Sequence, residues 1–68
     1  MKNSNAWRQF YSLKRAMEDH AVLTTHGTRI DSIDFRSVKV NDAGSFIEVL
    51  LKGGREMVSV NLMDIEIK

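Results

Sequence analysis

The sequence predicts an α+β domain in which one N-terminal helix packs on a five-stranded, strongly bent antiparallel sheet or small barrel. Two observations lead to this class. Over residues 5–19, apolar side chains recur at helical spacing, which favours a helix with one buried face. Over residues 21–67, apolar side chains form short, largely alternating runs separated by glycines and small polar residues, which is typical of strands joined by turns. We expect the 68 residues to form a single domain, with residues 1–4 as an N-terminal tail.

The helix is predicted over residues 5–19. Ser4 or Asn5 can cap its start, because each carries a side-chain oxygen that accepts a hydrogen bond from a free amide of the first turn. Glu18 and Asp19 are acids near the negative end of the helix dipole, so we expect the helix to end there. The apolar stripe has spacings of four, three and four residues and consists of Ala6, Phe10, Leu13 and Met17.

The longest predicted strand covers residues 29–40 and has to bend. Two apolar pairs in it have opposite alternation phases, namely Ile33 with Phe35 and Val38 with Val40. A flat strand would place these pairs on opposite faces of the sheet. A bulge or a sharp bend near residues 36–37 would turn both pairs inward, and we expect one of the two there.

The other strands are shorter. Residues 22–25 favour extended backbone before a turn at Gly27. Residues 46–51 are apolar at both alternation phases, which predicts a central strand. The pair Gly53-Gly54 accepts the positive φ angles of a type I′ hairpin turn. After it, alternating apolar residues predict two further strands, over residues 58–62 and 65–67.

The composition excludes some of the usual means of stabilising so short a chain. It contains no cysteine and only two histidines, so we expect no disulfide, no structural metal and no cofactor. A domain of this size buries only roughly 60% of the surface that its unfolded chain exposes. We therefore expect self-association, with a two-fold dimer as the favoured arrangement. The apolar strand at residues 46–51 and an unpaired edge at residues 65–67 are the features that favour it.

Location and charge give weaker indications. A membrane span needs about 20 apolar residues, and the sequence has no such stretch and no apolar leader at its start. We therefore expect a cytoplasmic protein without a membrane partner. The net charge of +1 is too small to indicate a polyanionic partner. Its distribution is uneven, because residues 1–17 carry four cations and no acid, whereas residues 40–68 are mildly acidic.

The order of one helix and five strands, with a bend in the second strand, resembles the Sm/Hfq-type small β-barrel. The stretch AVLTTHGTRIDSIDF, with Gly27 and the pair Asp34-Phe35, is similar to the first motif of that family. The stretch SFIEVLLKGGREMVSVNLMDIEI is similar to its second motif. SH3-like modules and the bacterial Rho inhibitor Rof have a similar order of elements. The lysine–histidine pair of Hfq-type proteins has no counterpart, because residues 61–64 are Asn-Leu-Met-Asp.

No catalytic constellation is evident in the sequence. His20 and His26 are six residues apart, and no cysteine or carboxylate motif accompanies them, so we interpret both as structural or solvated residues. Asp31, Asp34 and Asp64 are interpreted as surface acids on strand edges, and a magnesium site is the less favoured alternative. We therefore predict that the protein is not an enzyme.

Two surfaces are candidate binding sites. The first suits RNA or single-stranded nucleic acid, because cations pair with phosphates and rings stack on bases. It consists of Arg8, Lys14, Arg15, Trp7 and Tyr11. The alternative interpretation is a solvated helix face whose aromatic rings pack on the sheet. The second is an apolar protein interface, unless its side chains lie under the helix, and it consists of Phe46, Leu50, Met57, Met63 and Ile65.

The sequence favours a small regulatory or accessory protein, of the kind that bacteria or phages encode, which acts by stoichiometric binding. The low net charge and the missing lysine–histidine pair favour a protein partner. Binding of RNA or single-stranded nucleic acid through the basic helix is the alternative.

Overall fold

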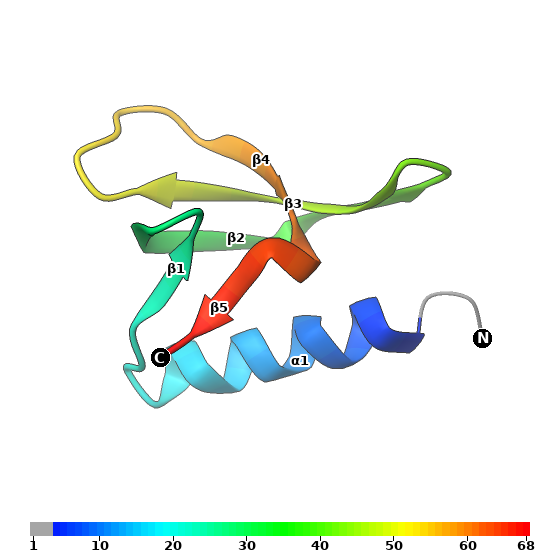
Figure 1. The fold of residues 1–68 in the computed structure, drawn as a ribbon, viewed down its shortest axis with the longest axis horizontal. Coiled ribbons are helices and arrows are strands. Elements are labelled where there is room, and N and C mark those ends of the chain that lie inside the picture. Colours follow the sequence, from blue (N-terminus) through cyan, green and yellow to red (C-terminus); the bar gives the residue numbers. More distant parts are fainter. Residues whose placement is uncertain (1–3) are drawn as a thin grey trace.

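The computed structural model describes residues 4–68 and is an α+β domain with one helix and one five-stranded antiparallel sheet (Figure 1). The strand order in the sheet is β4-β3-β2-β1-β5. The elements are α1 (Ser4–Glu18), β1 (Leu23–Thr25), β2 (Thr28–Asn41), β3 (Gly44–Leu51), β4 (Val58–Asn61), the 3-10 helix η1 (Leu62–Asp64) and β5 (Ile65–Ile67). The predicted order of one helix and five strands is confirmed. Of the predicted tail, residues 1–3 lie outside the described residues, and Ser4 already belongs to the helix.

Helix α1 matches the predicted range to within one residue at each end. Its predicted apolar stripe faces the core, because Leu13 is fully buried and the other members pack against buried residues. The helix ends in a Schellman motif, in which His20 adopts a left-handed φ of 58°. The amide of Ala21 donates to the carbonyl of Ala16 at 2.9 Å, and the amide of His20 donates to Met17 at 3.1 Å.

The core lies between α1, η1 and one face of the sheet (Figure 1). β3 pairs with both β2 and β4, so the prediction that it is a central strand is confirmed. Its side chains alternate between buried and half-buried positions, as expected for a strand with one face on the core. The buried apolar residues are Leu13, Ala16, Leu23, Ile30, Ile47, Val49, Leu62 and Ile65.

A side chain on α1 fixes the helix to the end of the sheet. The side-chain amide of Gln9 donates to the carbonyl of Leu62 at 3.2 Å and to that of Ile65 at 2.8 Å. These carbonyls belong to η1 and β5, and the carbonyl of Leu62 also accepts from the backbone amide of Ile65. Gln9 therefore links α1 to the point where η1 ends and β5 begins.

Strand β2 carries the predicted bulge. Between the pairs Asp34–Glu48 and Lys39–Phe46, β2 advances five residues while β3 advances two. Ser37 stabilises this irregularity, since its hydroxyl donates to the carbonyl of Asp34 at 2.6 Å and accepts from the amide of Glu48 at 2.7 Å. The bulge brings Val38 against the core. The prediction failed for Val40, which remains exposed near the end of the hairpin.

The sheet is neither closed into a barrel nor strongly curled, so the predicted barrel and strong bend are wrong. Closure requires strands long enough to tilt and stagger around a common axis. Here β1, β4 and β5 have only three, four and three residues. β4 and β5 remain the two edges of the sheet, and α1 covers the core instead.

The predicted turn at Gly27 is confirmed, and His26-Gly27, not Gly53-Gly54, forms the type I′ hairpin turn. Thr25 pairs with Thr28, and the two residues between them have φ angles of 50° and 80°, as a type I′ turn requires. β3 and β4 are joined instead by residues 52–57. In that loop Gly53 has a φ of 82°, and the amide of Gly54 donates to the carbonyl of Leu51 at 2.8 Å. Gly53-Gly54 thus forms part of a β-turn within a longer loop.

Within residues 4–68, no helix is both long enough and apolar enough to cross a membrane.

Candidate functional site

The structure brings the five predicted nucleic-acid-binding residues together on the exposed side of α1. Tyr11 is at the centre, because each of the other four is three or four residues away from it, and residues at this spacing are neighbours on a helix surface. All five are exposed. We call this set the aromatic–basic face, and it consists of Trp7, Arg8, Tyr11, Lys14 and Arg15.

The two rings of the aromatic–basic face are exposed but held in place. Trp7 is 44% exposed and Tyr11 is 63% exposed, so neither ring packs fully on the sheet. Both contact Phe10 edge to face, with ring centroids 5.5 and 5.3 Å apart. Phe10 in turn contacts Phe35 of β2 at 5.5 Å. This contact with the sheet restrains Trp7 and Tyr11, and their remaining surface is free to stack on a planar ligand.

The cations of the aromatic–basic face have no carboxylate partner within residues 4–68. There, the only contact of this kind joins His26 and Asp64, with nitrogen and oxygen 3.6 Å apart, and it is an ion pair only when the imidazole is protonated. Lys14 instead lies over the ring of Phe10, with its Nζ 5.8 Å from the ring centroid. Arg8, Lys14 and Arg15 are therefore not held in ion pairs within the described residues, although Glu18 is four residues from Lys14 and three from Arg15 on the same helix.

The predicted protein interface is not assembled as one surface. Ile65 is only 3% exposed and belongs to the core, because β5 pairs with β1 and places it there. Its assignment to an exposed interface is therefore wrong. Phe46 and Leu50 are half-buried on the face of β3 that points away from the core. Met57 and Met63 are exposed, in the β3–β4 loop and in η1 respectively.

The contacts of the histidine and aspartate candidates are with turns and strands of the fold. His26 lies in the type I′ turn and contacts Asp64 across to η1. Asp34 accepts a hydrogen bond from the amide of Arg36 at 3.0 Å, within the bulged part of β2. No three His, Cys, Asp or Glu side chains of the described chain come close enough to form a metal site.

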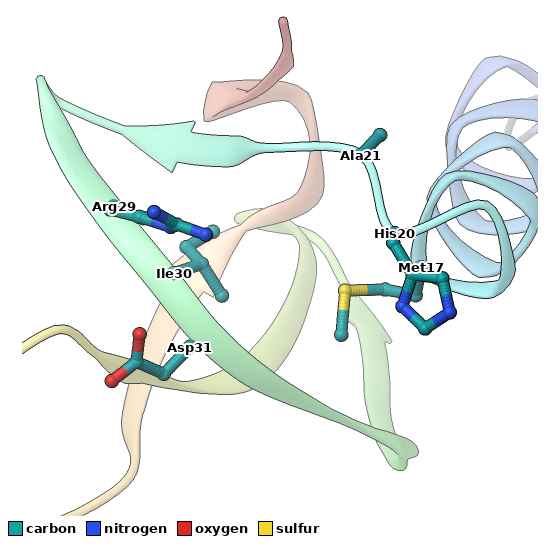
Figure 2. Close-up of a pocket in the computed structure, with 6 residues that line it drawn as sticks. All are labelled: Met17, His20, Ala21, Arg29, Ile30 and Asp31. Carbon is teal, nitrogen blue, oxygen red and sulfur yellow. The ribbon is translucent and has the colours of Figure 1, made fainter.

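A shallow, open cleft that the sequence did not predict lies between the C-terminal end of α1 and β2. Its volume is about 200 Å³, and it is lined by Met17, His20, Ala21, Arg29, Ile30 and Asp31 (Figure 2). These residues come from segments that the sequence alone does not place side by side.

Comparison of the chain with known protein families, with curated protein sequences and with solved structures found no match. No family is therefore identified, and the structure confirms only the order of elements that was predicted, one N-terminal helix followed by five antiparallel strands. The open sheet differs from the closed barrel that the resemblance implies. The chain is a small α+β domain with an exposed aromatic–basic face on α1.

Proposed function

We propose that this protein is a small, non-enzymatic regulatory or accessory module that binds single-stranded nucleic acid through the aromatic–basic face of α1. The observation that supports this is the arrangement around Tyr11, where two exposed rings and three cations without carboxylate partners share one helix face. The protein would act by stoichiometric binding and be of bacterial or phage type.

In the proposed mode of binding, the aromatic rings contact the bases and the cations contact the phosphates. Tyr11 and Trp7 stack on bases, and each stacked base contributes about 1–3 kcal/mol. Arg8, Lys14 and Arg15 pair with phosphates and release counterions from the strand, which makes the affinity fall with salt. Since every base has a π face, we expect little sequence preference on this surface.

Fluorescence anisotropy with a labelled single-stranded oligonucleotide of about ten nucleotides tests the proposal. We expect Tyr11→Ala to weaken binding about tenfold, because a stacked base is lost. The logarithm of the binding constant should fall with the logarithm of salt concentration with a slope of about −2, as three phosphate contacts predict. Lys52→Ala is the matched control for Lys14→Ala, because Lys52 is exposed in the β3–β4 loop. Equal effects of these two lysine substitutions would contradict the proposal.

A protein partner, which the sequence favoured, is the second candidate. The exposure of Met63, at 57% of its surface, supports it, since flexible methionines are common at adaptable contacts. The test is capture from a bacterial lysate with and without nuclease. A protein that is retained after nuclease treatment, and lost with Met63→Asp, would favour this candidate over nucleic acid.

A further inference from the structure

We propose that the aromatic–basic face selects single strands that are extended and unstacked, and that it holds two successive bases on Trp7 and Tyr11. The strand then runs parallel to the axis of α1. The inference rests on the proposed function and deepens it, because it names the conformation of the strand that binds. The rings contact the faces of bases and not their edges, so the selection acts on how readily a strand unstacks.

The two exposed rings lie one helical turn apart. Trp7 and Tyr11 are four residues apart in α1, which separates their backbones by about 6 Å along the helix axis. Both rings contact Phe10, with centroid distances of 5.5 and 5.3 Å, so the distance between their own centroids cannot exceed the sum of these two. Phe10 also contacts Phe35 of β2, at 5.5 Å. The spacing of the two rings is therefore set by the fold.

This spacing does not match a stacked strand. Successive nucleotides of a stacked strand are about 3.4 Å apart, whereas those of an extended strand can lie about twice as far apart. In a stacked strand, each internal base has both faces covered by its neighbours, so only a terminal base can stack on a protein ring. Two neighbouring bases can reach Trp7 and Tyr11 together only if the stack between them opens. Binding to both rings therefore requires an extended strand.

The arginines give the backbone of the strand its direction. Arg8 and Arg15 are seven residues apart, close to two full turns, so they lie on the same side of α1 about 10 Å apart along its axis. Tyr11 lies between them along the axis, and Lys14 is the neighbour of Tyr11 towards the C-terminal end. An extended strand covers the distance between the two arginines in about two nucleotides. Phosphates at the arginines and bases on the rings therefore align the strand with the helix.

An acid limits the length of this contact. Glu18 is seven residues after Tyr11 and so lies on the same side of α1, where it repels phosphates. The first turn of the helix carries no acid. From Trp7 to Arg15 the helix rises by about 12 Å, which corresponds to about two or three nucleotides of an extended strand. We therefore expect a site of this size.

Fluorescence anisotropy with two strands of equal length, about ten nucleotides, tests the inference. Oligothymidylate stacks weakly and oligoadenylate stacks strongly, so we expect the protein to bind the thymidylate strand about fivefold more tightly. Tyr11→Ala leaves a single ring, on which a stacked strand can place its terminal base, and should reduce the preference to about twofold or less. Tyr11 is 63% exposed, so its removal leaves the core intact. Ser12→Ala, on the exposed side of the same helix, is the matched control and should keep the full preference.

A titration with the dinucleotide TpT tests whether one molecule contacts both rings. The chain contains one tryptophan and one tyrosine, so each ring has its own signal. We expect TpT to quench the fluorescence of Trp7 and to shift the ring resonances of Tyr11 with a common midpoint. Thymidine monophosphate carries more negative charge but only one base, and should bind about tenfold more weakly because one stacked base is lost.

Three results would overturn the inference. They are equal or tighter binding of the adenylate strand, a preference that persists undiminished in Tyr11→Ala, and separate midpoints for Trp7 and Tyr11 in the titration with TpT. In each of these cases a strand still binds to the protein, and the proposed function stands. If neither strand binds, the proposed function fails and the inference fails with it.

Discussion

Both histidines of the chain have left-handed backbone, with φ angles of 58° for His20 and 50° for His26. Each ends an element, since His20 follows α1 and His26 opens the turn between β1 and β2. The sequence placed one histidine at a helix end and the other in a turn, because glycine and polar residues mark such sites. It did not predict the left-handed backbone, since glycine or asparagine is the usual residue there. The hydrogen bonds of the elements around each histidine impose this left-handed backbone.

Thr25 is the residue at which the core departs most from simple burial rules. Its side chain is 2% exposed, and its hydroxyl has no hydrogen-bond partner within residues 4–68. We expect Thr25→Val to raise the free energy of unfolding by about 1 kcal/mol, because an unsatisfied buried hydroxyl is replaced by a methyl group. Urea unfolding followed by circular dichroism measures it. Thr28→Val, at the exposed cross-strand position, should change little, and a loss of stability in Thr25→Val would show that the hydroxyl has a partner in solution.

At the scale of elements, hydrophobic periodicity was sufficient to locate an element where many residues contribute to the pattern. The stripe of α1 repeats over about three turns, and the phase change in β2 located the irregularity near residues 36–37. The hairpin turn was misplaced because Gly53-Gly54 has the stronger local signal for a type I′ turn. The register of β3 with β4 prevents a tight turn at Gly53-Gly54, because Val49 pairs with Val58 and a long loop joins the two strands. Such cross-strand packing is not visible in a local pattern.

The attachment of α1 to the end of the sheet depends on Gln9. We expect Gln9→Ala to lower the free energy of unfolding by about 1–3 kcal/mol, because the carbonyl of Ile65 loses the donor that Gln9 provides, whereas the carbonyl of Leu62 keeps the backbone amide of Ile65. Ser12→Ala, on the exposed side of the same helix, controls for the change in helix propensity. Thermal unfolding of both variants measures the effect. If the two variants have equal stability, the hydrogen bonds of Gln9 do not hold the helix in place.

For the whole molecule, the sequence predicted the class, the order of elements and a five-stranded antiparallel sheet, but the strong bend or barrel closure that it predicted for this sheet is wrong. Barrel closure depends on strand length and stagger, and the bounds of strands as short as β1 and β5 are set by tertiary contacts. The aromatic–basic face was predictable because it lies on one helix, where spacing alone determines which residues are neighbours. The cleft was not, because α1 and β2 meet only in the folded chain.

The open sheet has two edge strands, and they differ in how well they are protected from pairing with a strand of another molecule. β5 carries Glu66, whereas β4 has the sequence Val-Ser-Val-Asn without a charge or a proline. Uncharged edges readily pair with another strand. We therefore propose that the chain forms a two-fold dimer in which the β4 strands of two copies pair, so that one sheet continues across both copies.

Light scattering across a concentration series tests this dimer. We expect the mass to rise towards twice the 7.8 kDa of one chain, and the melting temperature to rise with concentration because association stabilises the fold. Ser59→Lys places a charge at the exposed centre of β4 and should keep the protein monomeric, since pairing would bring two lysines together. Ser12→Lys adds the same charge on the outer side of α1 and should leave the dimer intact. A mass that stays at 7.8 kDa at every concentration, with a constant melting temperature, would show that α1 alone is sufficient to cover the core and that the β4 edge stays unpaired.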